Sequence, residues 1–134
     1  MNDIQAKSIS QMRKGILEYC ILLILNQRRS YSADILEVLK DHNLIVVEGT
    51  LYPLLTRLRK DGFLDYTWEE SPQGPPRKYY VLTKEGHEWL QQLSSAWSEM
   101  RQSITALEKG TNNYPEISPF ENRDCDQLFV EKDN

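Results

Sequence analysis

The spacing of the apolar residues changes after Gly62, and this change constrains the fold more than any other feature of the chain. Before it, apolar residues recur three or four positions apart, as they do on one face of a helix. Phe63–Trp68 and Lys78–Leu82 are instead rich in aromatic and branched residues, which is typical of β-strands. Glu69–Arg77, between them, contains three prolines and a glycine and predicts an exposed loop. We therefore expect helices followed by one antiparallel hairpin.

Three helices are expected before the hairpin and one long helix after it. Their expected bounds are Ile4–Gln27, Ala33–Asp41, Leu51–Asp61 and Lys84–Lys109. Ser30 or Ser32 is suited to cap the second helix, and Thr83 to cap the last one. Gly62 stands where a left-handed residue commonly ends a helix. The expected fold class is mainly α (small α+β): a helix-turn-helix followed by a two-stranded wing.

The first and third helices carry apolar faces that are expected to meet in the core. The recurring apolar residues of the first helix are Ile9, Met12, Ile16, Cys20 and Leu23, with Leu17, Ile21 and Ile24 widening the stripe. The buried face expected for the third helix consists of Leu51, Leu54, Leu55 and Leu58. A helix that is apolar over as much of its circumference as the first belongs in the middle of a core.

The charge of the chain is distributed unevenly. The formal net charge is −4, but residues 1–109 hold 14 basic and 14 acidic side chains and are neutral as a whole. Residues 110–134 hold two basic and six acidic side chains, so they carry the entire −4. Because affinity for phosphates depends on local charge, a neutral body can still bind nucleic acid through one basic face.

Basic and hydroxyl side chains gather on the third helix and on the hairpin. Residues 50–60 include three basic side chains and no acidic one, and Arg77-Lys78 follow the prolines of the hairpin. A helix fits the major groove of B-form DNA, and a cationic hairpin beside it reaches the phosphates or the minor groove. The expected DNA-binding residues are Thr50, Tyr52, Thr56, Arg57, Lys60, Arg77 and Lys78. A solvated basic surface is the alternative reading for the helix taken alone.

Several short motifs resemble those of a known family. They are Glu48-Gly49-Thr50-Leu51-Tyr52-Pro53-Leu54-Leu55, Arg57-Leu58, Asp61-Gly62, Gly74-Pro75-Pro76-Arg77-Lys78-Tyr79-Tyr80, Leu82-Thr83 and Gly86. Together they resemble the signature of the PadR family of bacterial repressors over about residues 10–109. The resemblance implies a winged-helix DNA-binding protein whose effectors act at the dimer interface or its cleft.

The last helix carries a heptad seam, which predicts a homodimer. Its members are Leu90, Leu93, Trp97, Met100, Ile104 and Leu107. A seam of this kind packs against another helix, here the first helix of the domain and the symmetry mate. Two reading helices would then address half-sites ~34 Å apart in a near-palindromic operator. The expected organisation is a DNA-binding domain over 1–82, a dimerisation helix over 83–109 and an acidic, flexible tail over 110–134.

Trp97 and Met100 are the candidate effector-binding residues. The family resemblance implies that some relatives hold flat aromatic compounds between paired tryptophans at the point matching Trp97. We expect a planar aromatic or phenolic effector to weaken operator binding there. The alternative is that Trp97 belongs to the dimer core.

Other classes of function have little support in the sequence. His42 and His87 are the only histidines, and neither a metal-ligand cluster nor a glycine-rich phosphate loop is present, so we expect no enzyme, metal or cofactor. Cys20 and Cys125 lack zinc spacing. The apolar run Tyr19–Leu25 is far shorter than the about 20 residues that span a bilayer, so a cytoplasmic protein is expected. A winged-helix module that binds a protein instead of DNA remains the alternative.

Overall fold

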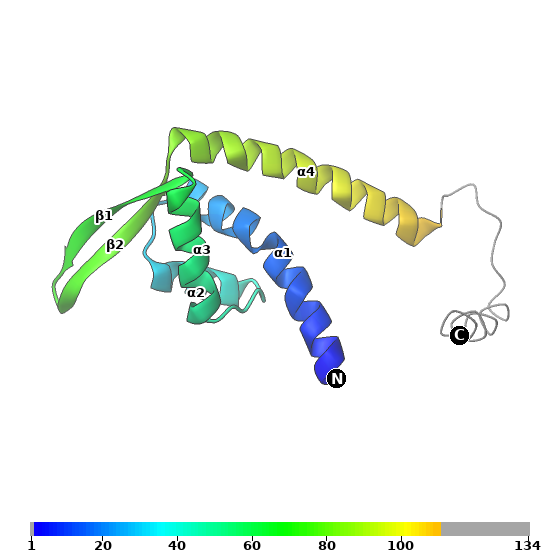
Figure 1. Cartoon of the computed structure of the whole chain (residues 1–134), viewed down its shortest axis with the longest axis horizontal. Helices are drawn as coiled ribbons and strands as arrows, with labels where there is room; N and C mark the ends of the chain where they lie inside the picture. The colour runs from blue at the N-terminus through cyan, green and yellow to red at the C-terminus, as the bar shows by residue number, and fades with distance from the viewer. Residues whose placement is uncertain (1, 111–134) are drawn as a thin grey trace, which may run out of the picture. The chain divides into compact units, whose positions relative to one another are not determined.

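The structure, a computed structural model, describes residues 2–110. Its elements are α1 (Asp3–Gln27), α2 (Ser32–Asp41), α3 (Glu48–Lys60), β1 (Leu64–Ser71), β2 (Gly74–Leu82) and α4 (Lys84–Lys109) (Figure 1). The predicted order of three helices, a hairpin and a long helix is confirmed. The compact body ends at Glu99, within α4, and a second unit begins at Met100. The acidic tail predicted over 110–134 lies outside the described residues, apart from Gly110.

The core of the body forms where α2, α3 and the base of the hairpin pack against the second half of α1 (Figure 1). The buried apolar residues are Leu17, Ile21, Leu22, Leu25, Ile35, Leu39, Leu51, Leu55, Leu58, Leu64, Tyr80 and Leu90. The face expected for α3 is confirmed at Leu51, Leu55 and Leu58, each fully buried, while Leu54 is half-buried.

The inward face of α1 differs from the predicted stripe. Met12 is 74% exposed and Leu23 is 38% exposed, whereas Leu22 and Leu25, which lay outside that stripe, are buried. Apolar side chains surround much of the second half of this helix, so their spacing does not specify which side the neighbouring elements cover. In the first half no apolar side chain reaches the core.

Neither of the two serines expected to cap α2 does so. The Ser30 hydroxyl donates to the carbonyl oxygen of Arg28, and Ser32 is the first residue of the helix. The carboxylate of Asp34 instead accepts a hydrogen bond from the backbone N–H of Tyr31, at 3.3 Å. Ser30 is fully buried and exchanges two backbone hydrogen bonds with Tyr80, which attaches the segment before α2 to the hairpin.

The hairpin strands extend further than predicted, and the expected loop over Glu69–Arg77 is largely strand. Only Pro72 and Gln73 form the turn. Glu69 pairs with Arg77 and Ser71 with Gly74, so one residue of β1 lies opposite Pro75 and Pro76 of β2 in a bulge. A two-stranded sheet consists of edge strands, where a proline at a bulge removes no essential hydrogen bond. Proline content therefore did not exclude a strand here.

The junction between the hairpin and α4 is closely packed. Gly62 has a φ of 87°, the left-handed conformation expected of it. The Thr83 hydroxyl donates to the carbonyl oxygen of Gly62 and accepts from the backbone N–H of Gly86, at 2.6 and 3.0 Å, so the predicted Thr83 cap is confirmed. A Cβ at Gly86 would lie 2.0 Å from the carbonyl oxygen of Phe63. The start of α4 is thereby held against the base of the hairpin.

Candidate nucleic-acid interface

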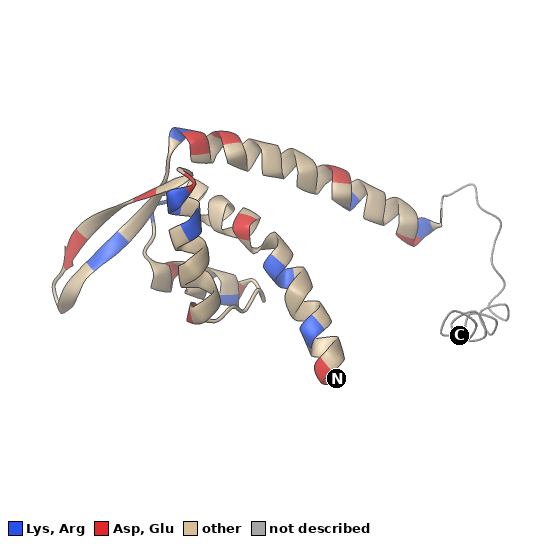
Figure 2. Ribbon diagram, viewed as in Figure 1, with Lys and Arg blue, Asp and Glu red and all other residues tan. Residues whose placement is uncertain are grey.

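Helix α3 presents a polar face on the side opposite the core. Tyr52, Thr56 and Lys60 are exposed along it, and the last turn is basic (Figure 2). The Ser32 hydroxyl donates to the Tyr52 hydroxyl at 3.2 Å, and the Thr56 hydroxyl donates to the Tyr52 carbonyl oxygen at 3.1 Å. Both α3 hydroxyls are therefore held in place by hydrogen bonds before any ligand arrives.

The two cations of β2 lie over aromatic rings. The Arg77 guanidinium is 4.7 Å from the centroid of the Tyr31 ring, and the Lys78 ammonium is 4.6 Å from that of Tyr66. Within residues 2–110, neither cation has a carboxylate within ion-pairing distance. Their charges are therefore available to an anion, and the rings hold the long side chains in place.

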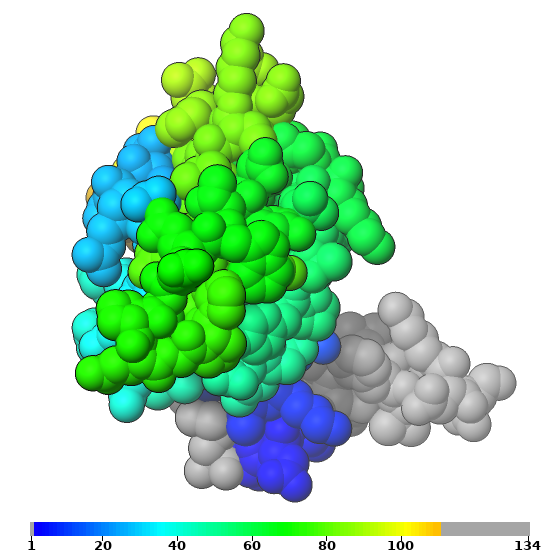
Figure 3. Space-filling model, turned by 90° about the vertical axis from the view of Figure 1, so that its left-hand side faces the viewer, coloured from blue at the N-terminus to red at the C-terminus, as the bar shows by residue number. Residues whose placement is uncertain are grey.

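A groove brings α3 and β2 together. Its volume is about 470 Å³. The residues that line it are Tyr31, Ser32, Ala33, Tyr52, Thr56, Arg77, Lys78 and Tyr80. Figure 3, which views the hairpin from its tip, shows the hairpin atoms directly beside those of α3. This α3–wing groove unites four of the seven predicted DNA-binding residues, two from each element.

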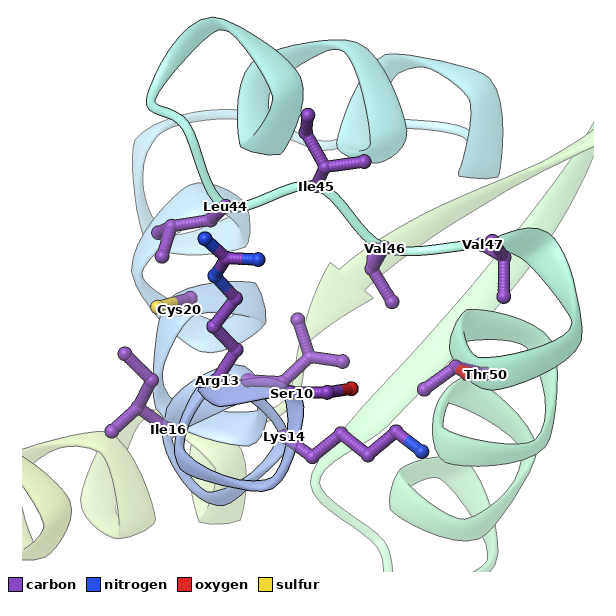
Figure 4. A pocket seen from close by; sticks show the side chains of 11 residues that line it. Ser10, Arg13, Lys14, Ile16, Cys20, Leu44, Ile45, Val46, Val47 and Thr50 are labelled. Carbon is purple, nitrogen blue, oxygen red and sulfur yellow. The ribbon is translucent and has the colours of Figure 1, made fainter. Parts of the chain in front are cut away.

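The other three predicted residues lie outside the groove. Arg57 forms an ion pair with Glu18 of α1, at 3.0 Å, and a longer one with Asp61, at 3.5 Å. Thr50 is half-buried and lines a separate cavity of about 190 Å³ between α1 and the segment that joins α2 to α3 (Figure 4). Lys60 is exposed on the polar face of α3. A phosphate would have to compete with Glu18 for Arg57.

Several residues at this surface were not identified from the sequence. The Arg59 guanidinium stacks over the Tyr66 ring at 4.3 Å, on the hairpin side of α3. Ser32 and Tyr31 reach the groove from the start of α2. The basic character of Arg59 was visible in the sequence, but its contact with Tyr66 depends on how the hairpin packs. No local pattern marks Tyr31 or Ser32 as part of the surface.

Tyr80 contributes a neutral phenol to the groove. Burial raises its pKa, and the neighbouring Tyr66 and Tyr52 phenols act in the same direction, while Arg59 acts against them. The Tyr80 hydroxyl therefore keeps its proton at physiological pH and adds no negative charge beside Arg77 and Lys78. Burial also raises the pKa of the Cys20 thiol on α1, which makes it a poor nucleophile.

The residues of the predicted seam on α4 differ in exposure. Leu90 is buried in the core of its own chain, and Leu93 is half-buried against it. Trp97 is half-buried, with its ring 6.4 Å from that of Tyr19. Met100, Ile104 and Leu107 are each more than half exposed. Within residues 2–110, no helix combines the length and the hydropathy needed to cross a membrane.

Comparisons with known proteins agree with this architecture. The profile of the transcriptional regulator PadR-like family matches residues 21–92, which is more than half of the chain. A PadR-like transcription factor from Bacteroides fragilis is 53% identical, covering 75% of this chain and 98% of that one, with a TM-score of 0.64. A PadR family regulator from Eggerthella lenta is 31% identical, covering 78% and 88%, with a TM-score of 0.68.

A curated protein of Lysinibacillus sphaericus, itself described as uncharacterized, is 26% identical over 104 residues, which are 75% of this chain and 95% of that protein. The matched segment of the family profile begins in α1 and ends in α4, so it contains α3, the hairpin and the groove between them. PadR proteins are transcriptional regulators rather than enzymes. The chain therefore belongs to the PadR-like family of transcriptional regulators.

Proposed function

We propose that the protein is a homodimeric repressor that binds duplex DNA through α3 and the α3–wing groove. One observation carries the proposal: side chains that are 25 positions apart in the sequence, such as Tyr52 and Arg77, line one groove. Its two cations have no carboxylate partner within residues 2–110. Surfaces that combine a helix with hydroxyl groups and free cations suit the edges of bases and the phosphates of a duplex.

The residues of the surface take different roles in this proposal. Tyr52 and Thr56 face base edges or adjacent phosphates, while Arg77 and Lys78 bind the backbone beside the minor groove. Lys60 adds a backbone contact from the end of α3. Thr50 and Arg57 contribute from the flank of the helix, and Arg57 does so only after leaving Glu18.

The exposed part of the α4 seam supports the homodimer. Met100, Ile104 and Leu107 are 54%, 52% and 68% exposed and recur at heptad spacing. A second copy would remove this stripe from water and set two α3 helices against a near-palindromic operator. Repression then follows from occupation of the operator by the dimer.

A small effector would release the repressor by favouring a dimer geometry that does not fit DNA. We place a planar aromatic or phenolic compound against Trp97 and Met100. The half-buried Trp97 ring beside Tyr19 supports this position, since it offers an aromatic surface that its own chain leaves partly uncovered. The same surface suits dimer packing. If planar aromatic compounds bind at Trp97, they should quench the tryptophan fluorescence of the wild type, and this quenching should be lost in Trp97→Ala.

The experiment that tests DNA binding uses duplexes selected by the protein from a random library. Arg77→Ala with Lys78→Ala should lower affinity at least tenfold at about 150 mM salt, and the slope of log K against log salt should fall by about 1.8, or 0.9 per lost contact. The matched control is Lys84→Ala with Lys109→Ala, which removes the same charge from α4. Unchanged affinity in the first variant, with its oligomeric state intact, would refute DNA contact through Arg77 and Lys78. Failure of the wild type to select any duplex would favour a protein-binding module instead.

A further inference from the structure

We infer that Trp68 is a further DNA contact, whose indole packs on the sugar–phosphate backbone beside the α3–wing groove. The inference rests on the proposed DNA-binding function. Trp68 is 60% exposed, although tryptophan is normally well buried in a protein of this kind. It lies on β1 in register with Lys78 of β2. Residues paired in this way lie on the same face of a hairpin.

That face of the hairpin is the one that turns toward α3. Tyr80 and Lys78 belong to it and line the groove, together with Arg77 of the opposite face. Tyr66 belongs to it as well and lies under the guanidinium of Arg59 from α3, at 4.3 Å. A duplex held against α3 would therefore meet this face of the hairpin, on which Trp68 of β1 stands.

A ladder of alternating cations and rings connects α3 to Trp68. From Arg59 it passes to the Tyr66 ring, then to the Lys78 ammonium, which is 4.6 Å from Tyr66 and 5.3 Å from Trp68. The Tyr66 and Trp68 rings meet edge to face, with centroids 6.0 Å apart and planes at 89°. The ladder holds the indole in one orientation although solvent covers most of it.

The pairing of an exposed indole with a fixed ammonium matches the chemistry of a DNA strand. Deoxyribose offers an apolar surface next to the anionic phosphate, so the ring packs on the sugar while Lys78 binds the phosphate. A purely structural Trp68 would instead serve as a cross-strand partner of Lys78 and would not respond to DNA.

Fluorescence distinguishes these roles directly. Trp89→Phe with Trp97→Phe leaves Trp68 as the only tryptophan of the three. The indole nitrogen of Trp89 is buried without a hydrogen-bond partner, so phenylalanine loses no hydrogen bond there. On titration with the selected duplex, we expect quenching and a blue shift as the indole leaves water. Emission that stays constant while anisotropy of labelled DNA reports saturation overturns the inference.

Affinity measurements supply the second arm. Trp68→Ala should weaken binding of the selected duplex about tenfold, in the range of aromatic contacts with nucleic acid, with no change in the salt slope because no cation is lost. Trp68→Phe should keep most of the affinity. Thr67→Ala, on the opposite face of the same strand, is the matched control and should bind as the wild type does.

The possible outcomes distinguish failure of this inference from failure of the proposed DNA-binding function. If Trp68→Ala lowers the salt slope by about 0.9, as loss of one phosphate contact does, the indole acts only by holding Lys78 and direct contact is refuted. If the wild type binds DNA while Trp68 gives no signal and Trp68→Ala binds normally, the inference alone fails. If the wild type binds no duplex at any salt concentration, the proposed function fails and the inference with it.

Discussion

The core of the protein and the ends of its two longest helices differ in how far their apolar residues are buried. In α3, Leu51, Leu55 and Leu58 are completely buried. Near the start of α1, Ile4 and Met12 are 76% and 74% exposed, and α4 leaves its apolar residues uncovered from Met100 onward. All of these residues recur at helical spacing, so their pattern in the sequence is the same. Their environments differ, because some are buried in the core and the others are exposed to solvent.

This difference shows that apolar periodicity identifies a surface to be covered without identifying what covers it. The body covers its own surfaces with α2, α3 and the hairpin, so it needs no partner to form a core. The exposed apolar residues of α4 recur at heptad spacing, unlike the scattered apolar residues that any protein surface carries. In the proposed dimer, the second copy covers the exposed apolar residues of α4, as α2, α3 and the hairpin cover those of the core.

The largest effect should come from a charge placed in the exposed stripe. Ile104→Asp would put a carboxylate from each copy into the proposed interface, which should raise the dimer dissociation constant at least about a thousandfold, several kcal/mol. Sedimentation equilibrium would then give the 15.7 kDa of one chain. Gln102→Asp adds the same charge on the other side of α4 and should leave the mass of the dimer unchanged. Equal masses for the two variants would refute a dimer interface on the exposed residues of α4.

The next largest effect concerns the close packing of Gly86 against the Phe63 carbonyl group. Gly86→Ala forces a methyl group to within 2.0 Å of the Phe63 carbonyl oxygen, so α4 must move away from the hairpin. We expect a loss of about 3 kcal/mol in the free energy of unfolding, measured with urea. Gly15→Ala in α1 has nothing within 4 Å of the added Cβ and should raise stability by up to about 1 kcal/mol. Equal changes for both glycines would contradict the close packing of Gly86 against Phe63.

The smallest effect concerns the ion pair between Glu18 and Arg57. Glu18→Gln should change stability by less than about 0.5 kcal/mol, because the Arg57 side chain is 54% exposed and water screens the pair. DNA affinity should rise about twofold, since the carboxylate that competes with a phosphate is gone. Glu88→Gln, an exposed residue of α4, controls for the change in net charge. A fall in affinity below that of this control would show that Glu18 positions Arg57 for DNA.

Much of the fold and part of the site followed from local patterns. The order of elements, the caps at Thr83 and Gly62, and the buried leucines of α3 each depend on neighbours within a few positions. The hairpin bulge did not follow, because Pro75 and Pro76 signal a loop unless the strand is known to lie at an edge. Some of the predicted DNA-binding residues lie in the groove and others on its flanks, which also depends on contacts between distant residues. Arg57, for example, lies next to Glu18, which is 39 positions away in the sequence.

The order of three helices, a hairpin and a long helix could be read from the sequence, as could the basic residues of α3 and the Arg77-Lys78 pair of β2, since composition and spacing are local properties. Which side of α1 is buried, and which cations of residues 2–110 have no carboxylate partner, depended on the tertiary structure. It also decided that Trp68 shares a face with the groove. These features arise from contacts between residues far apart in the chain, and such contacts depend on how whole elements pack rather than on the preferences of any single segment.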